Sequence, residues 1–433
     1  MRWNAIVVLF WGVLCVTAVG LEAGDLQAGD GKTWYKGVTH FHTLWSDGNG
    51  APEVAVQWYR DAGYDFVCVS DHNIFQAEER WFAVSDEAKS RLTTEKVDAL
   101  RGAFGDDWVE TRTRDGKTEM RLKTYDDLVA RFEAPGEYLL IPGEEVTSPK
   151  AVHINALNIR ATIPAADGPD PVTIMRKDFA AIEAHGRDYR VPVLAHLNHP
   201  NFADAITAEE IVAIGGERFF EVYNGHGSVR NWGDAANHIV STDRLWDIVL
   251  SLRLGRDGDT RRPMYALASD DAHNWFYRGV GSSIPGRGWI VVLAEELSTE
   301  ALIAAMNLGH HYASSGVRVE RIVVSDEGYA VHIAAEPGVT YTTRFIGTPK
   351  DADLSAEPVR DDAGNPIRAT HRYGDDVGKV FLETTDNPAV YRFTGEEMYV
   401  RAKVTSSKPV EHPTVDGDLQ EAWLQPVCRV DLR

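Results

Sequence analysis

Apolar runs alternate with amphipathic stretches along residues 34 to about 315 of the chain. The first run is YKGVTHFH, and a helix is predicted over residues 51–62, where Pro52 suits the first helical turn and Val54 and Trp58 recur at helical spacing. The run YDFVCVS follows and is almost continuously apolar, which is typical of strands in parallel sheets. Together these segments predict one strand–helix–strand unit.

Later apolar runs repeat this pattern. They are YLLIPGEEV, AVHINALNI, VPVLAHLNHP, RFFEVYNG, MYALASDDAH and GWIVVLA, with helical patterns between several of them. Repeated strand–helix units of this kind predict a parallel sheet, most economically a closed barrel. Residues 74–136 interrupt the pattern with charged and helical pieces and with TRTRDGKTEM, a hairpin or loop, so they are predicted to be an insertion over one end of the strands.

From about residue 318 the pattern changes to short alternating strands, RIVVSD, YAVHIAA, YTTRFIG and EMYVRAKVTS. Turn residues separate them, and a helical pattern returns only at residues 419–423. This predicts a small antiparallel β domain over residues 318–433, after a barrel domain over residues 34–317.

The first 23 residues have the pattern of an export signal. Arg2 supplies a positive charge, residues 6–19 are apolar, and small residues follow near positions 20–23. The apolar run is short for a membrane anchor, so we expect a soluble periplasmic or secreted protein without a stable membrane span. Cys15 would leave with the signal, and whether Cys68 and Cys428 pair is left open.

The net charge of the 433-residue chain is −21 at pH 7. Proteins that bind nucleic acid normally present a basic face, so nucleic acid is not expected as a partner. An anionic substrate would have to be bound by a few local cations or by metal ions, against the overall field of the protein.

Histidines and carboxylates end nearly every predicted core strand. His40 and His42 are two positions apart on the first strand, so they face the same side of it. Other strand ends supply, in order, Asp47, Asp71 and His72, Glu144 and Glu145, His153, His196 and His199, and Asp270, Asp271 and His273. The strand ends of a barrel converge on one face, so the sequence predicts one cluster able to bind divalent metal ions.

The series HFHTLWSDG, SDHN, GEE, HINAL, NHP and DAH resembles the polymerase-and-histidinol-phosphatase (PHP) superfamily of metal-dependent hydrolases. The insertion, EVYNGHG, PGRGW and the β tail further resemble exported PHP proteins related to carbaryl-hydrolase-type metallohydrolases. The resemblance implies a distorted seven-stranded β/α barrel that binds two or three divalent ions, Zn, Mn or Fe. It also implies hydrolysis, of phosphoesters in most members and of ester or carbamate bonds in the carbaryl-hydrolase-like branch.

The resemblance also implies which residues bind the metals and which support them. The first metal would be bound by His40, His42, Glu145 and Asp271, the second by Glu145, His153 and His199, and the third by Asp47, His72 and His273. Asp47 stands where some members carry histidine, so the metal preference of the third site is left open. The implied nucleophile is a metal-bound hydroxide and not a protein side chain. Four further residues are predicted to orient the ligands, namely Asp71, Glu144, His196 and Asp270.

Substrate contacts are predicted from two loops. Arg278 in FYRGVG and Arg287 in PGRGW follow the last metal motif and are candidates for binding an anionic substrate, with a surface role on a glycine-rich loop as the alternative. In EVYNGHG, Asn224 and His226 are candidates for lining the pocket, and Glu221 is predicted to support the barrel.

Two other functions stay open at this point. The same metal centre could hydrolyse a carboxylic ester, a carbamate or an amide. Alternatively, the chain could be a non-catalytic surface protein with a structural metal cluster and a β domain that binds glycan or protein. Structural metal sites tend to have closed sets of ligands, so the open sets expected here favour catalysis.

Overall fold

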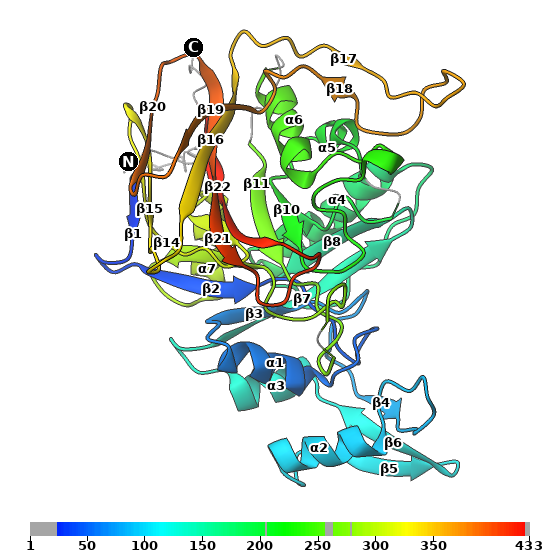
Figure 1. Ribbon diagram of the computed structural model, residues 1–433. Helices are drawn as coiled ribbons and strands as arrows, with labels where there is room; N and C mark the ends of the chain where they lie inside the picture. The colour runs from blue at the N-terminus through cyan, green and yellow to red at the C-terminus, as the bar shows by residue number, and fades with distance from the viewer. Residues whose placement is uncertain (1–23, 204–205, 256–262, 278, 429–433) are drawn as a thin grey trace, which may run out of the picture.

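The computed structural model describes residues 24–203, 206–255, 263–277 and 279–428 (Figure 1). The predicted export signal and Arg278 lie outside the described residues. Among the helices of the described residues, none has the length and apolar character needed to span a membrane.

One large mixed sheet runs through the molecule and contains 13 strands of the described residues. Their order is β11 (Tyr265–Ser269), β10 (Phe219–Asn224), β9 (Leu194–Leu197), β8 (Val152–Leu157), β7 (Leu139–Ser148), β3 (Phe66–Val69), β2 (Thr33–Val38), β12 (Trp289–Ala294), β13 (His311–Ser314), β22 (Leu419–Cys428), β21 (Glu397–Pro409), β16 (Tyr341–Pro349) and β19 (Lys379–Thr384).

The sheet is only partly parallel, contrary to the prediction. The neighbours β2, β3 and β7 pair in parallel, and so do β9, β10 and β11. Strand β8 is antiparallel to both β7 and β9. Only residues 149–151 connect β7 to β8, and a connection this short joins antiparallel strands, whereas a parallel crossover needs a dozen residues or more.

The predicted closed barrel is not found in the strand ladders of the described residues. Strand β12 pairs with β2 on one side and with β13 on the other, both antiparallel, so the sheet continues outward at that point. An isolated parallel bridge joins Phe41, beyond the end of β2, to Ala272, beyond the end of β11. This bridge brings the two ends of the run from β2 to β11 together without closing the ladder. The fold is therefore mixed α/β with a large open sheet.

Helices pack against the strands on more than one side. Helix α1 (Pro52–Asp61) begins at a proline, as predicted, and lies beside α3 (Tyr125–Phe132) near β3 (Figure 1). Helices α4 (Pro171–Tyr189), α5 (Ala208–Ile214) and α6 (Thr242–Gly255) lie together beside β8 and β10, and α7 (Thr299–Asn307) packs on β12. A short 3-10 helix, Ala235–Asn237, precedes α6.

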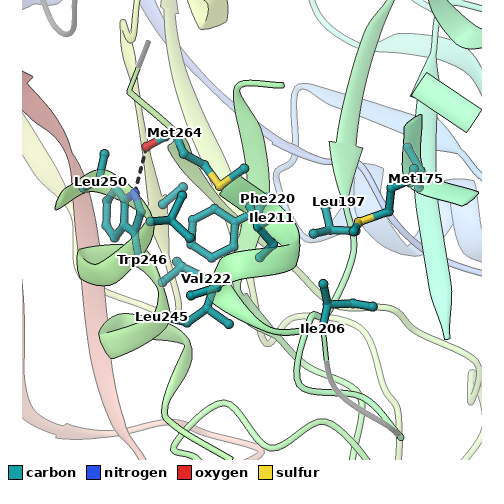
Figure 2. Packing of buried hydrophobic residues seen from close by; sticks show 14 of the residues in the cluster. Met175, Leu197, Ile206, Ile211, Phe220, Val222, Leu245, Trp246, Leu250 and Met264 are labelled. Carbon is teal, nitrogen blue, oxygen red and sulfur yellow. Dashed lines mark hydrogen bonds between the residues drawn. The ribbon is translucent and has the colours of Figure 1, made fainter. Parts of the chain in front are cut away.

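The largest hydrophobic core lies between α4–α6 and the sheet. Figure 2 shows Trp246 and Leu250 of α6 packed with Phe220 of β10 and with Met264, which precedes β11. The indole nitrogen of Trp246 donates to the Met264 carbonyl at 2.7 Å, so the one polar atom of this ring is satisfied in the core. This packing fixes the positions of β10 and β11, whose far ends carry part of the site described below.

Residues 74–136 hold a small layer of their own. Strands β4 (Arg80–Ala83), β6 (Lys117–Leu122) and β5 (Thr111–Arg114) form an antiparallel sheet, and α2 (Thr94–Phe104) lies beside it at the lower end of the molecule in Figure 1. The segment TRTRDGKTEM is the β5–β6 hairpin, which turns at Asp115 and Gly116 with positive φ.

The described residues after 318 form antiparallel ladders. Strands β1 (Gly24–Gln27), β14 (Val319–Val324), β15 (Gly328–Ile333) and β20 (Ala389–Arg392) make a second sheet, and β17 (Ala356–Glu357) pairs with β18 (Arg372–Tyr373). The helical pattern predicted at residues 419–423 is wrong, because these residues begin β22. Pairing with β21 and β13 on either side fixes the extended conformation there and overrides the local pattern.

The two cysteines that follow the predicted signal are free. Cys68 is buried in β3 and Cys428 ends β22, with no disulfide bond between them.

Candidate metal centre

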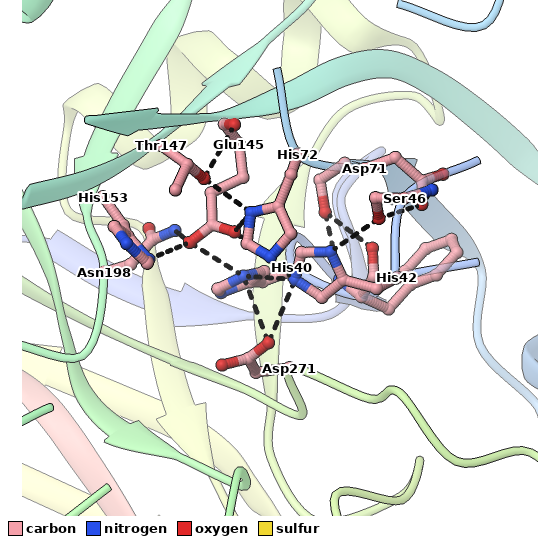
Figure 3. A network of polar contacts seen from close by, with 12 residues as sticks. His40, His42, Ser46, Asp71, His72, Glu145, Thr147, His153, Asn198 and Asp271 are labelled. Carbon is pink, nitrogen blue, oxygen red and sulfur yellow. Dashed lines mark hydrogen bonds and ion pairs between the residues drawn. The ribbon is translucent and has the colours of Figure 1, made fainter. Parts of the chain in front are cut away.

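The predicted ligands gather at one end of the strands. They are His40, His42 and Asp47 beyond β2, His72 beyond β3, Glu145 in β7, His153 in β8, His199 beyond β9, and Asp271 and His273 beyond β11. Figure 3 shows several of these side chains pointing toward one another around Glu145. Their ligand atoms form four overlapping groups, each with its atoms within 4.8 Å of one another: His42, Asp47, His72 and His273; His40, His42 and Glu145; His40, His199 and Asp271; and Glu145, His153 and His199.

The first group comprises the ligands predicted for the first metal, His40, His42, Glu145 and Asp271, and all four are buried. The Nε2 atoms of His40 and His42 lie 3.1 Å apart, and Asp271 Oδ1 lies 3.4 and 3.1 Å from them. Glu145 oxygens lie 3.4 Å from each of the same two nitrogens. Ligands at about 2.0–2.1 Å from a tetrahedral ion are separated by roughly 3.3 Å, so this donor set fits a divalent ion.

Glu145 also belongs to the second group, which it forms with His153 and His199. Its Oε1 lies 3.1 Å from His153 Nδ1 and 3.3 Å from His199 Nε2. The other oxygen, Oε2, lies 2.6 Å from His72 Nδ1 and 3.4 Å from His42 Nε2. One carboxylate therefore faces two separate sets of imidazoles, as a bridging ligand does.

The third group, Asp47, His72 and His273, lies at the mouth of the cluster. Asp47 Oδ1 is 3.3 Å from His273 Nε2, 3.5 Å from His72 Nε2 and 3.9 Å from His42 Nδ1. The Asp47 side chain is 58% exposed, whereas His42 is fully buried. His42, which the sequence placed only at the first site, stands between the first and third groups, with its ring 4.2 Å from those of both His72 and His273.

Charges within the cluster suit cation binding. Burial opposes ionisation of Glu145, but His72, His40 and His153 together hold its pKa well below the usual range. Burial likewise opposes ionisation of Asp271, and His40 and His42 hold its pKa well below normal. Burial and two nearby imidazoles lower the pKa of His42 to about 3. The carboxylates are thus anionic and His42 is neutral, which are the forms that bind metal. Burial opposes the charges on His40 and His72, but the nearby carboxylates raise the pKa of His40 well above its usual value and that of His72 to about 9, so these two imidazoles would release protons on metal binding.

Two ligands have unusual backbone conformations. Asp271 has φ of 50° and His199 has φ of 22°, in the region that favours glycine. Such strain persists only where the surrounding structure imposes it, and it concentrates at functional sites. The Asp271 backbone is held by its amide, which donates to the His40 carbonyl at 3.0 Å.

Glu221 orients His40, a role that the sequence analysis missed. Its Oε1 accepts from His40 Nδ1 at 2.8 Å, which leaves Nε2 directed at the first group. Glu221 also accepts from Ser269 Oγ of β11, from the His199 amide beyond β9 and from Asn224 Nδ2 of its own strand, so its position is fixed from both neighbouring strands. The signal for this role was the position of Glu221 on β10, where a glutamate occurs within the apolar run RFFEVYNG.

Asp71 orients His42 through Ser46. Asp71 accepts from Ser46 Oγ at 2.6 Å, from the Thr43 amide at 2.7 Å and from Thr43 Oγ1 at 2.8 Å (Figure 3). Because the Ser46 hydroxyl donates to Asp71, it can only accept from His42 Nδ1, which lies 3.3 Å away. Asp71 therefore fixes the hydroxyl that accepts from His42, which is the contact predicted for a residue that orients a ligand.

The other three predicted supporting residues form no hydrogen bond to a candidate ligand among the described residues. Glu144 accepts from the Ile163 amide at 2.5 Å, and Asp270 accepts from Tyr59 and the amides of residues 286–288. His196 is buried in β9 and has no hydrogen-bonding partner among the described residues. Instead, Asn198 Nδ2 donates to Glu145 Oε1 at 2.8 Å, a contact that sequence reasoning did not identify.

The candidate substrate residues separate into three cases. Arg287 is wholly buried and its guanidinium donates to the carbonyls of residues 225, 279, 282, 412 and 413, which contradicts the predicted contact with an anion. Asn224 is buried and donates to Asp271 Oδ2 at 3.2 Å and to Glu221 Oε2 at 2.8 Å, so it is placed to support the predicted ligands. His226 is half-buried beside the third group, with its ring 5.2 Å from that of His273.

Comparisons with known proteins give only distant likenesses. No family model matches the chain, and no curated protein matches it. A crystal structure of a two-domain protein containing a predicted PHP-like metal-dependent phosphoesterase, from Bacteroides vulgatus, is 15% identical, with a TM-score of 0.39, covering 94% of this chain and 98% of that one.

Two further solved structures cover 55% of this chain and 87% of their own. One is a candidate metal-dependent phosphoesterase from Bifidobacterium adolescentis, with 13% identity and a TM-score of 0.30. The other is an amidohydrolase from Chromobacterium violaceum with bound sulfate and no metal, with 15% identity and a TM-score of 0.25. These scores are low, so the function has to be inferred from the site itself.

Proposed function

We propose that the chain is a metal-dependent hydrolase of the PHP superfamily, with two or three divalent ions and with phosphoesters as its substrates. The bridging position of Glu145 carries this proposal. Its Oε1 faces His153 and His199, and its Oε2 faces His42 and His72. A buried carboxylate shared between imidazole groups can hold two metal ions close together, as two-metal hydrolytic centres do.

Bound divalent ions would supply a water molecule of lowered pKa as nucleophile and would neutralise charge that develops on the attacked group. The residues of the chain prepare the site for this chemistry. Glu221 holds His40, and Asp71 holds His42 through Ser46, so both imidazoles present Nε2 to the first group. This preorganisation removes the energetic cost of turning the rings when an ion binds.

Substrate would approach from the side of the third group. The side chains of Asp47 and His72 are 58% and 24% exposed, whereas His40 and Glu145 are fully buried. His226 lies at the same edge, where its ring can donate a hydrogen bond to a substrate oxygen or to the leaving group. No protein side chain is required as a nucleophile.

The donor types favour transition metals. Imidazole suits Zn or Fe sites better than it suits Mg or Ca, the carboxylates of the cluster also suit Mn, and each of the four groups includes at least two histidines. We further propose that residues 1–23 export the protein to the periplasm or beyond. In this proposal residues 34–317 are catalytic, residues 74–136 are an insertion, and residues 318–433 form a β domain.

One observation favours a second substrate class. Arg287, the arginine expected to bind an anion, is buried and contacts five backbone carbonyls. A centre without that cation suits a neutral carboxylic ester, carbamate or amide as well as a phosphoester. This would agree with the carbaryl-hydrolase-like branch that the sequence resembles.

A substrate panel on metal-reconstituted protein tests the proposal. Chromogenic phosphomonoesters, phosphodiesters and aryl esters would be compared, with the His40→Ala, His42→Ala double variant as the inactive control. We expect turnover of phosphoesters that the double variant loses while it stays folded. Turnover of aryl esters alone would support the second class. Less than one equivalent of bound transition metal, or no turnover of any substrate, would refute a metal-dependent hydrolase and leave the non-catalytic alternative.

A further inference from the structure

The insertion reaches back to the loop that carries Asp47. Cationic side chains of β4, of α2 and of the segment between them point at this loop and donate to its backbone carbonyls. Arg80 donates to the Trp45 carbonyl, Arg91 to those of Ser46 at 2.5 Å and Gly48 at 3.0 Å, and Lys96 to that of Asn49 at 3.0 Å.

These contacts form one connected clamp on residues 45–49. Lys96 Nζ also donates to the Arg91 carbonyl at 2.7 Å, which joins α2 to the segment before it. Within the loop, a Cβ at Gly48 would lie 2.4 Å from the His42 carbonyl oxygen, so the loop backbone packs directly on a metal-ligand segment. A side chain at position 48 would push the loop outward.

The loop is also tied to the other side of the third group. The Asn49 amide donates to the His273 carbonyl at 2.8 Å, and Asn49 Oδ1 accepts from the Trp275 amide at 2.9 Å. The clamp therefore bears on both Asp47 and His273, which lie 226 positions apart in the chain.

Asp47 needs this external support. Its carboxylate has ion-pair contacts, among the described residues, with His42, His72 and His273. These partners are themselves candidate ligands, so the direction of the carboxylate has to be set by the loop backbone. Because Arg91 and Lys96 bind carbonyls, they fix the loop without competing for the carboxylate oxygens.

We propose that the insertion positions the third metal site, with Arg91 as the positioning residue that holds Asp47 toward His72 and His273. This inference rests on the proposed metal-dependent function, and it gives the insertion a role in setting how many ions bind. Residues that support a ligand from outside typically contribute 10–100-fold to metal affinity. Loss of Arg91 is therefore expected to weaken the third site while the first two, centred on Glu145, keep their affinity.

The test compares full-length wild type with Arg91→Met. Zn²⁺ and Mn²⁺ would be counted by elemental analysis after dialysis, and each affinity would be measured by competition with a chromogenic chelator. Arg101→Met is the matched control, because Arg101 also lies in the insertion but pairs with Asp98 of α2. Asp47→Asn, alone and combined with Arg91→Met, completes a double-mutant cycle. The melting temperature of each metal-free protein reports whether the fold survives.

The expected result is three equivalents in wild type and in Arg101→Met, and a third equivalent weakened roughly 10–100-fold in Arg91→Met. In the cycle, adding Arg91→Met to Asp47→Asn should weaken the affinity for the third ion little further, because both substitutions act through the Asp47 carboxylate. Equal affinity for the third ion in wild type and Arg91→Met would overturn the inference, and so would a wild type that binds no more than two. A wild type that binds no metal would refute the proposed function as well. If Arg91→Met does not fold, Lys96→Met takes its place, with the same expected result.

Discussion

His40 Nδ1 lies 2.8 Å from Oε1 of Glu221, a residue 181 positions later in the chain. Both side chains are fully buried. Burial opposes the charge on His40, but Asp271, Glu221 and Glu145 together raise its pKa well above the ordinary value. The hydrogen bond to Glu221 fixes the orientation of the ring and the proton on Nδ1, and the raised pKa means that Nε2, which is directed at the first group, has to release a proton when an ion binds.

Glu221→Gln is expected to weaken metal binding at the first group by about 10–100-fold, since the amide keeps the shape of the side chain but loses its charge. The measurement is competition with a chelator on the purified protein. Glu217→Gln, which alters a half-buried glutamate before the same strand, is the matched control. Unchanged affinity in Glu221→Gln would show that packing orients the His40 ring without the Glu221 charge.

Arg287→Met is expected to lower the free energy of unfolding by about 3 kcal/mol. Each buried carbonyl that loses its donor costs about 1–3 kcal/mol, and hydrogen bonds from water to some of these carbonyls offset part of the total. It should change KM for an anionic substrate less than threefold under conditions where the variant is folded. Chemical denaturation and steady-state kinetics measure the two effects. The control is Arg60→Met, at an exposed position of α1. A tenfold rise in KM at unchanged stability would restore Arg287 as a substrate contact.

The clustering of the candidate metal ligands was more accessible to sequence reasoning than the fold around them. Ligands such as His42 and Glu145 occur in short motifs at strand ends, and side-chain alternation along a strand is a local property. The roles of Glu221 and Arg287 could not be predicted in this way. Their partners lie far away along the chain, at His40 for Glu221 and at residues 412 and 413 for Arg287.

The direction of the strands and the continuity of the sheet could likewise not be predicted from the local sequence. The run AVHINALNI has the apolar character of a parallel strand, yet β8 is antiparallel because a three-residue turn precedes it. The segment from Leu419 has a short helical pattern, and only its pairing with β13 and β21 makes it a strand. In both cases a neighbour in the sheet decides the conformation, and the local pattern does not contain that neighbour.

Asp247→Ala is expected to destabilise the protein by about 3–5 kcal/mol, because it leaves a buried arginine poorly compensated. Asp247 of α6 accepts from Arg401 of β21 at 2.7 and 2.8 Å, and Arg401 is 1% exposed. The pair joins α6 to a strand of the C-terminal segment. Urea denaturation measures the loss, and Arg401→Leu combined with Asp247→Leu should recover part of it. A loss below 1 kcal/mol would mean that Asp243, at 3.1 Å from Arg401, compensates the charge by itself.

His311 is buried on β13 between Phe219 and Tyr265, the first residues of β10 and β11, whereas Asp271 and His273 lie beyond the other end of β11. Burial, followed by the positive charges of His310 and Arg218, lowers its pKa to about 3. In the unfolded chain a histidine has a pKa of about 6.5. Between these two pH values the unfolded state binds a proton at His311 and the folded state does not. The free energy of unfolding must therefore fall as the pH falls from about 6.5 toward about 3.

The slope from one such group approaches about 1.4 kcal/mol per pH unit. His311→Leu removes it, so the free energy of unfolding should fall less steeply for the variant than for wild type between pH 6 and pH 4.5. Urea denaturation of the metal-free proteins across this range measures both slopes. His332→Leu, at a half-buried position of β15, controls for the loss of a histidine as such. Equal slopes for wild type and His311→Leu would mean that the folded protein accommodates a charged His311, and the buried position would then have to admit water or a counter-charge.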